Sequence, residues 1–454
     1  MSPVPHQVFS YHSVREIQEK AEALHISLPF AEDTGALLRP AEFHGVSLPN
    51  RMGTAPMEGA DSEADGSPSA LTERRYLREA AGGSAVIWFE AVSIVPEGRS
   101  SAHQLYIHPG NVDAFRRMND RLREEGLRKN GFAPYLIMQA NHSGRYSNPF
   151  GRPAPLIAYR NPIYEKLRPA DDTCIVSDAY LKSLEEKFGE AALLAREAGF
   201  DAVDVKACHG YLLMELLSAY TRPGEYGGSF ENRSRLLLNA LRAARAHETR
   251  EFRVTARIGI HDGFPWPCGF GVKEGGNAAP DWTEAKLLLQ EIRGLGLEMV
   301  NLTMGNPYVN SHVSRPFNHG KYVPDEDPLV GVARMIHGIR EVKEAVPGMF
   351  VYASGPSFMR QFCDLFAAGA VEQGFCDGML FGRMAFADPD FANQILRTGR
   401  IDPKQVCVAC GKCGDLIRAG KPTGCVVRDS AVYLPPYREY LAELAEKQAQ
   451  EGKA

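Results

Sequence analysis

The 454-residue chain is long enough for two ordinary domains or for one large α/β barrel with extensions. Its hydrophobic fraction of 44% and charged fraction of 24% indicate a globular protein with a large core and exclude general disorder. The net charge of -5, without a basic cluster, argues against nucleic acid or a membrane surface and favours a small-molecule partner. Because the sequence shows no apolar signal region and no apolar run of membrane-spanning length, the expected location is the cytoplasm.

Between about residue 50 and residue 400, eight short apolar runs alternate with amphipathic stretches, as in a parallel sheet with crossover helices. The expected strands are 52–56, 85–91, 133–139, 202–207, 253–259, 299–304, 350–353 and 378–381. The expected helices between them include 181–198, 231–247, 282–293 and 331–345. The competing doubly wound sheet lacks its G-x-G-x-x-G fingerprint after the first strand, so we predict an α/β fold, a (β/α)8 TIM barrel.

Three segments follow from this pattern. Residues 1–40 form an N-terminal extension with two short helical patches, residues 41–401 form the barrel, and residues 402–454 form a short four-cysteine segment with a polar helical tail. The long loop 141–177 is rich in Pro, Arg and Tyr, and its length predicts a functional cover. The polar stretch 222–233 is interpreted as a rigid turn and helix cap.

Barrel enzymes keep their chemistry at the C-terminal ends of the strands, and several polar residues are expected there. His209 and Tyr211 follow the fourth run, where they could bind a carbonyl oxygen and donate a proton; packing roles are the alternative. Lys206 lies within that run. It suits a contact with a charged substrate or with a cofactor, while a Schiff-base nucleophile and chance placement stay open.

Other strand ends carry groups suited to an anionic ligand. Gln139 ends the third run and Arg257 the fifth, and a buried arginine there needs an anionic or electron-rich partner, the alternative being a surface ion pair. Gly355 follows the seventh run, and Gly382 and Arg383 follow the eighth. Glycine amides and a cation at these two strand ends suit a phosphate group.

Four of the nine cysteines fall within one short segment, at Cys407, Cys410, Cys413 and Cys425. In a reducing compartment this clustering favours a metal site over disulfides. Three thiolates at i, i+3 and i+6 with a distant fourth favour a [4Fe–4S] cluster. Zinc is the main rival, because it also takes four thiolates.

With these residues in place, the chain resembles the iron–sulfur branch of the old yellow enzyme family, which includes 2,4-dienoyl-CoA reductase and trimethylamine dehydrogenase. The resemblance runs from about Leu37 to Tyr433. It is carried by Asn50-Arg51, Ala55-Pro56-Met57, Gly82-Gly83, Glu90-Ala91, Gln139, His142 to Arg145, His209 to Leu213, Glu225 to Arg233, Phe381 to Arg383, Asp388-Pro389 and the four-cysteine segment.

This resemblance implies an FMN-binding barrel that reduces an activated C=C bond. Tyr211 would be the proton donor, and His209 would take the second place of the pair that grips the substrate. The cofactor contacts implied are Gln139 at the pyrimidine edge, Arg257 near N1 and O2, the backbone of Pro56, Met57 and Glu58 along the isoalloxazine, and Gly355, Gly382 and Arg383 at the phosphate.

Two positions depart from the family pattern. Lys206 stands where many relatives have histidine, which makes an anionic substrate more attractive than a simple enone. Glu58 stands where threonine or cysteine is common, and an ionised carboxylate beside the flavin would disfavour its anionic reduced form.

Related multidomain enzymes continue into a second nucleotide-binding region, which we do not find in this sequence. Electrons are therefore expected to pass singly between FMN and the cluster, to or from a separate protein such as a ferredoxin, an electron-transferring flavoprotein or a reductase subunit. A purely structural cluster and a homo-oligomer are both compatible with the sequence. The alternatives are an electron-transfer subunit of a larger complex, or an amine dehydrogenase of the trimethylamine dehydrogenase type with cage walls from Tyr146, Trp266 and Tyr308.

Overall fold

The computed structural model describes residues 6–43 and 45–451. Its centre is a closed barrel of eight parallel strands in the order β10-β3-β4-β5-β6-β7-β8-β9, which confirms the predicted TIM barrel. The barrel strands are β3 (Met52–Thr54), β4 (Val86–Ser93), β5 (Tyr135–Asn141), β6 (Ala202–Ala207), β7 (Arg253–Gly259), β8 (Met299–Thr303), β9 (Phe350–Ser354) and β10 (Gly378–Phe381).

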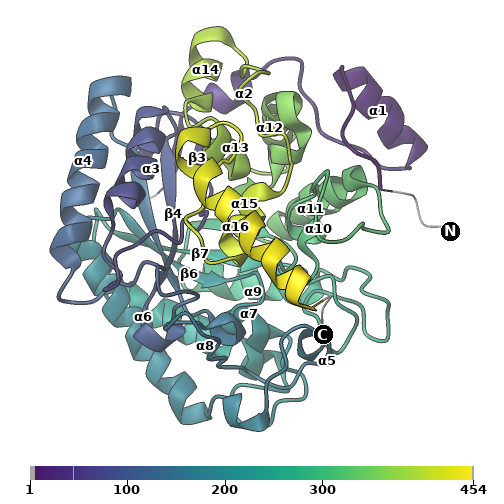
Figure 1. Cartoon of the computed structure of the whole chain (residues 1–454). Helices are drawn as coiled ribbons and strands as arrows, with labels where there is room; N and C mark the ends of the chain where they lie inside the picture. Colours follow the sequence, from purple (N-terminus) through teal and green to yellow (C-terminus); the bar gives the residue numbers. More distant parts are fainter. Residues whose placement is uncertain (1–5, 44, 452–454) are drawn as a thin grey trace.

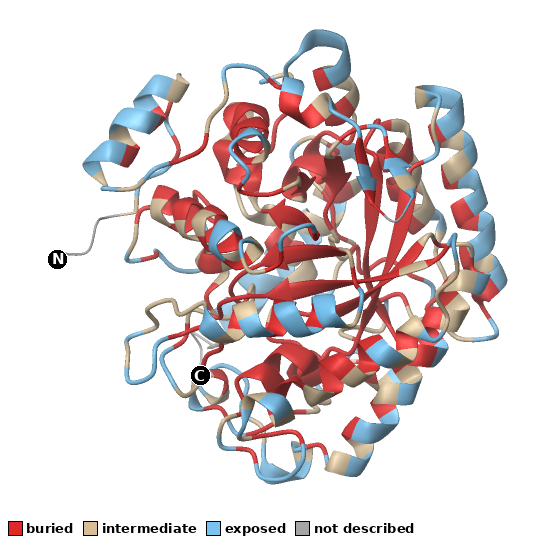
Figure 2. Cartoon of the chain, turned by 180° about the vertical axis from the view of Figure 1, so that it is seen from behind, coloured by how far each residue is buried: buried red, intermediate tan, exposed pale blue. Residues whose placement is uncertain are grey.

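These strands were recognisable because they are covered on both faces. Every residue of β4, β5 and β6 is buried, as expected for parallel strands that read as nearly continuous apolar runs. Figure 2 shows the buried strands in red at the centre and helices whose outer faces are exposed. The register pairs Gln139 with Asp204 and Lys206 with Arg257 on neighbouring strands, so these polar residues share one end of the barrel.

Helices cover the barrel between successive strands, and their bounds differ from the predicted ones by a few residues at each end. The outer helices are α3 (Ala70–Ala81), α4 (Val112–Asn130), α6 (Asp178–Glu197), α8 (Phe230–Arg245), α9 (Thr283–Gly294), α11 (Pro328–Lys343), α12 (Cys363–Glu372) and α14 (Phe391–Thr398). Shorter elements are α1 (Val14–Ala23), α2 (Gly35–Leu38), α5 (Pro162–Glu165), α7 (Leu212–Leu217), α10 (Ser311–Ser314), α13 (Arg383–Ala387), and the 3-10 turns η1 (Pro96–Gly98), η2 (Gly144–Tyr146), η3 (Asp172–Cys174) and η4 (Pro356–Phe362).

A small antiparallel hairpin, β1 (Ala41–Phe43) and β2 (Val46–Leu48), closes the N-terminal end of the barrel. Phe43 packs against Tyr135 and Phe350, the first residues of β5 and β9, with ring centroids 5.7 and 6.0 Å apart. Apolar side chains fill the barrel at this end, and barrel enzymes keep their active sites at the opposite end.

The cysteine segment crosses that opposite end and continues into α15 (Lys412–Arg418) and α16 (Ser430–Glu451), drawn in yellow in Figure 1. The Thr423 amide donates to the Gly59 carbonyl at 2.7 Å, and Asp429 accepts from Arg74 and Arg78 of α3 at 2.8 and 2.6 Å. The segment is thus attached to the barrel by both backbone and ionic contacts. Within the described part of the chain, none of the helices has the length and apolar character needed to cross a bilayer.

Candidate active site

One cavity at the C-terminal ends of the strands gathers every residue predicted to be catalytic or to bind flavin. It encloses about 1080 Å³ of space, counting its open mouth. That is ample for a cofactor with a substrate beside it. The predicted residues that line it are Pro56, Met57, Glu58, Gln139, Lys206, His209, Tyr211, Arg257, Gly355, Gly382 and Arg383. Their individual roles stay predictions.

A buried carboxylate that sequence reasoning did not single out fixes the floor of this cavity. Asp204 accepts hydrogen bonds from Gln139 Nε2 at 2.6 Å, from Trp88 Nε1 at 2.7 Å and from the backbone amide of Arg257 at 2.5 Å. Burial raises its pKa to about 6, although these donors oppose the shift. Because its amide nitrogen is held in this way, Gln139 is oriented before any ligand arrives.

Arg257 carries a buried charge without an acceptor. Its side chain is 5% exposed, Nε has no hydrogen-bond partner, and no carboxylate of the described residues forms an ion pair with it. Burial lowers the pKa of its guanidinium, a sign that the protein itself compensates the charge poorly. A cation left in this state fits the electron-rich edge of a flavin ring.

The loops after β9 and β10 form a cradle suited to phosphate. Gly355 has φ of 94°, a left-handed conformation that favours glycine, and a Cβ there would meet Met335 Sδ at 2.8 Å. Arg383 opens α13, and its Nη2 donates to the Pro316 carbonyl at 2.8 Å. Together with the acceptor-free Arg257, this cradle makes the cavity fit FMN.

The catalytic candidates sit in the turn between β6 and α7. His209 has φ of 65°, an unusual conformation for a residue with a Cβ and one that clusters at functional sites. Burial and the neighbouring cations hold its pKa well below 6.5, so its imidazole is neutral. Tyr211 is 3% exposed, its hydroxyl lies 2.7 Å from that of Tyr308, and burial raises its pKa well above 10. It is therefore a protonated donor at neutral pH.

Lys206 projects its ammonium over the Tyr211 ring, with Nζ 3.8 Å from the ring centroid. No carboxylate of the described residues makes an ion pair with it, and its side chain is 5% exposed. Burial lowers its pKa to about 8, partly offset by Glu58 and other nearby groups. The lysine is thus a cation at neutral pH that offers its hydrogens to the cavity.

Glu58 differs from the ionised group considered above. Ser100 Oγ donates to its carboxyl through a short hydrogen bond. Burial raises its pKa, while Ser100, Lys206 and Tyr211 act in the opposite direction. The site therefore favours the neutral form of the Glu58 carboxyl more than water does at a surface glutamate. A neutral carboxyl has a weaker effect on the flavin than the ionised group expected from the sequence.

Two of the three aromatic residues considered as cage walls are in contact with each other. Tyr146 and Tyr308 stack with centroids 4.0 Å apart, and Asn306 bonds to the Tyr146 hydroxyl at 2.9 Å. Trp266 lies elsewhere, near Tyr220 and 37% exposed. Tyr146 and Tyr308 are both named as cage walls from the sequence, and the structure brings these two together.

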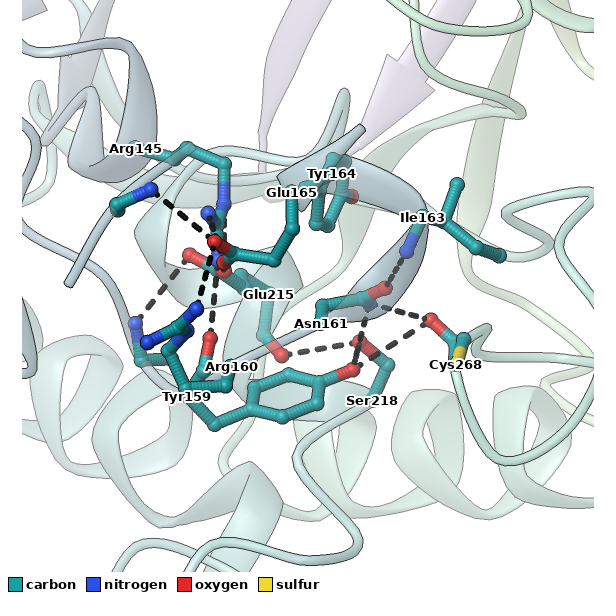
Figure 3. Close-up of polar contacts among 12 residues, drawn as sticks. Arg145, Tyr159, Arg160, Asn161, Ile163, Tyr164, Glu165, Glu215, Ser218 and Cys268 are labelled. Atoms are coloured by element: carbon teal, nitrogen blue, oxygen red, sulfur yellow. Dashed lines mark hydrogen bonds and ion pairs between the residues drawn. The ribbon is translucent and has the colours of Figure 1, made fainter. Parts of the chain in front are cut away.

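The long loop 141–177 is ordered by a buried ionic network, drawn in Figure 3. Arg145 Nη2 lies 2.6 Å from Glu215 of α7, Nη1 lies 3.0 Å from Glu165, and none of the Arg145 side chain is exposed. Arg145 also donates to the Tyr159 carbonyl at 2.9 Å. Because Tyr146 is the next residue and stacks on Tyr308, this network supports the part of the cavity wall that Tyr308 forms.

The four cysteines line a separate, smaller cavity, here called the cysteine cavity. Cys413 lines the flavin cavity as well. Two sulfurs accept backbone hydrogen bonds, Cys407 from Ala409 at 3.4 Å and Cys425 from Arg428 at 3.3 Å. Such bonds are typical of thiolates that hold an iron–sulfur cluster. Across residues 6–43 and 45–451, no group of three or more His, Cys, Asp or Glu side chains is close enough together to hold a metal ion.

Comparison with known proteins agrees with this geometry. The NADH:flavin oxidoreductase / NADH oxidase family matches residues 36–273, more than half of the chain. The chain belongs to this family. Membership in this family makes it a flavin-dependent oxidoreductase, with FMN as the cofactor.

Two curated relatives match different lengths of this chain. An NADPH dehydrogenase from Halalkalibacterium halodurans is 32% identical over 197 residues, which are 42% of this chain and 54% of the relative. A metal reductase from Desulforamulus reducens is 24% identical over 401 residues, 87% of this chain and 54% of the relative. The chain thus spans about half the length of these curated relatives.

Two solved structures share the fold. A 2-naphthoyl-CoA reductase bound to 2-naphthoyl-CoA has a TM-score of 0.71 at 20% identity, over 87% of this chain and 57% of the other. Histamine dehydrogenase from Rhizobium sp. 4-9 has a TM-score of 0.65 at 20% identity, over 87% and 52%. At these identities the two structures support the barrel and its extension, and leave the substrate open.

Proposed function

We propose that this oxidoreductase reduces an activated C=C bond in an anionic substrate, with Tyr211 as the proton donor. The observation that carries the proposal is the convergence of Lys206, His209 and Tyr211 beside the flavin contacts in one cavity. When bound there, FMN supplies a hydride to the β-carbon of the alkene. With the proton from Tyr211, the double bond gains two hydrogens in all.

The protein side chains then divide the remaining work. Lys206 and the neutral His209 bind the electron-withdrawing group of the substrate, so that negative charge developing on its oxygen is stabilised. Tyr211 transfers its hydroxyl proton to the α-carbon. After the transfer, the Tyr308 hydroxyl, 2.7 Å away, can turn to donate a hydrogen bond to the tyrosinate oxygen until a proton returns. Gln139, Arg257, Gly355, Gly382 and Arg383 would hold the cofactor.

The charge of the cavity favours an anionic substrate over an amine. Its lining carries five cations and a single acid, Glu58, among the described residues; the cations are Lys206, Arg257, Arg315, Arg383 and Arg418. In addition, the guanidinium of Arg168 lies over the rings of Tyr146 and Tyr308, at 4.9 and 5.7 Å, where a caged ammonium would bind. The likeness to 2-naphthoyl-CoA reductase makes an acyl-CoA thioester a natural first substrate to assay.

We further propose that Cys407, Cys410, Cys413 and Cys425 hold a [4Fe–4S] cluster. A single zinc ion would draw its four thiolates to about 2.3 Å from the metal. Four cysteines around one cavity, three of them closely spaced in sequence, suit a cluster, as do the two N–H···S hydrogen bonds. The cluster would supply single electrons from a separate donor protein, such as a ferredoxin, and Cys413 borders both cavities.

The test of the proton donor is Tyr211→Phe in the FMN-loaded protein, assayed anaerobically with an enoyl-CoA or aryl-CoA thioester. Loss of a general acid predicts a fall in kcat of about 10²- to 10⁴-fold. FMN content, read from the absorption spectrum, should stay within twofold of the wild type. Undiminished turnover by the variant, or turnover of amines and not of thioesters, contradicts the proposal.

The electron source is tested separately. Reduced ferredoxin and NADPH are offered as alternative donors to protein whose iron content has been measured. Rapid reduction by ferredoxin that is lost in Cys413→Ser supports the relay. Efficient turnover with NADPH alone, unchanged in Cys413→Ser, would contradict the relay. It would instead indicate direct reduction by NADPH, as the name of the NADPH dehydrogenase relatives implies for them.

A further inference from the structure

A second cavity adjoins the flavin cavity on its outer side. It encloses about 700 Å³, counting its mouth, and is formed mainly by the loop 307–322 after β8 and by the cysteine segment. The two cavities are adjacent, because they share five lining residues, namely Pro307, Tyr308, Arg315, Arg383 and Arg418. A ligand that passes between these side chains can extend from the flavin cavity into the second one.

The lining of this second cavity is strongly cationic. Arg315, Lys321, Arg383 and Arg418 all border it, and no aspartate or glutamate of the described residues does. Like charges in one enclosed space repel one another unless an anion lies between them.

Arg315 is the group without a partner. Among the described residues its guanidinium has neither a hydrogen-bond acceptor nor an ion pair. By contrast, Arg383 donates to Pro316, and Arg418 pairs with Asp415 at 2.6 Å, although Arg418 Nε stays buried without an acceptor. The chain also makes room for Arg315, since a Cβ on Gly414 would lie 2.8 Å from its Nη2.

The cofactor phosphate does not account for this charge. The glycine cradle expected to hold it, Gly355 and Gly382, lines the flavin cavity and not the second cavity. Of the residues assigned to the phosphate, only Arg383 borders both spaces. The cofactor phosphate therefore does not account for Arg315, Lys321 and Arg418.

We propose that the second cavity binds the anionic end of the substrate, a phosphate or carboxylate group carried at a distance from the reacting double bond. The assignment of this anion to the substrate rests on the proposed function; the anion site itself does not. Arg315 and Arg418 are the principal donors, since a guanidinium group binds phosphate or carboxylate in a bidentate manner, through two parallel N–H···O hydrogen bonds. Lys321 adds charge at the rim.

The experiment uses the full chain saturated with FMN, so that the phosphate cradle is filled. Titration calorimetry with pyrophosphate and, separately, with succinate distinguishes the two sources of the anion. Wild-type protein should bind at least one of them. Because charge-assisted hydrogen bonds are lost, Arg315→Met and Arg418→Met should each weaken that binding about 10-fold or more. Arg242→Met, which removes an exposed arginine of α8 away from the cavity, should change it less than twofold.

A second arm compares turnover of one enoyl group presented as its CoA thioester and as its uncharged pantetheine thioester. Arg315→Met should raise KM about 10-fold more for the first than for the second. Failure of both anions to bind, or equal binding by wild type and Arg315→Met, overturns the anion site. If anion binding depends on Arg315 but the protein reduces no alkene, the anion site is supported. The proposed function is then contradicted.

Discussion

Two buried arginines of this barrel are treated in opposite ways. Arg145, in the loop that covers the site, is enclosed by Glu215, Glu165 and a backbone carbonyl, so its charge is matched within the protein. Arg257, at the end of β7, is nearly as enclosed and has no acceptor. In the covering loop the charge of Arg145 is thus matched by carboxylates, whereas in the cavity the charge of Arg257 has no acceptor.

The difference separates structure from function. A paired buried charge stabilises the geometry of its surroundings and is costly to break on one side. An unpaired buried charge destabilises the free protein and is retained only where a ligand supplies the missing partner. By this criterion Arg145 is a positioning residue, and Arg257 marks a binding site.

The largest expected effect comes from breaking the complete network. Arg145→Met leaves Glu215 buried without its cation and should lower the free energy of unfolding by about 3–5 kcal/mol. Arg160 offers a matched control, because it pairs with the same Glu165 at 3.2 Å but is 47% exposed. Arg160→Met should cost about 1 kcal/mol or less. Urea denaturation of both variants measures the contrast, and equal losses would refute it.

Removing the unpaired cation should act in the other direction. Arg257→Met takes an uncompensated charge out of the interior, so the apoprotein should melt at the same temperature as wild type or higher. FMN affinity should fall about 10- to 100-fold, since a charge-assisted hydrogen bond is lost. Thermal melting without FMN, combined with flavin fluorescence titration, checks both. An apoprotein much less stable than wild type would show that Arg257 is structural.

The third effect concerns Lys206, whose pKa of about 8 is lowered by burial. Below this pH the ammonium is present to bind the substrate; above it the group is neutral. We therefore expect kcat/KM to fall about tenfold per pH unit above pH 8. Lys206→Arg keeps its charge, so its profile should stay level to higher pH. A wild-type profile that is level through pH 9.5 would exclude the lysine from substrate binding.

The smallest effect is expected for Asp204→Asn. The amide has one acceptor oxygen where the carboxylate has two, so at least one donor among Gln139, Trp88 and the Arg257 amide loses its partner. FMN affinity should fall about 2- to 12-fold through a less fixed Gln139. The emission of Trp88, isolated by comparison with Trp88→Phe, should shift in the variant. Unchanged emission and affinity would show that Asp204 does not position Gln139.

The sequence predicted the barrel well because its strands are buried on both faces and separated by amphipathic helices. All eight strands lie where the apolar runs indicated. The strand-end rule, together with the family resemblance, also placed the catalytic and flavin-binding candidates around one cavity. These successes share a cause, since each depends on local pattern and on a topology that fixes where strands end.

What the sequence did not reveal depends on contacts between distant segments. Arg315 and Arg418 come from separate loops, and only folding brings them to one space. The role of Asp204 follows from register, which pairs it with Gln139 on the next strand. The packing of Tyr308 against Tyr146 likewise joins two loops with no common pattern.

The wall of the flavin cavity joins residues synthesised early with residues synthesised late. Ala55 to Glu58 line one side, while Cys413, Ile417 and Thr423 line another, and the Thr423 amide bonds to Gly59. A nascent chain therefore has a barrel before it has a closed pocket. Closure of the flavin cavity must therefore await release of the cysteine segment from the ribosome.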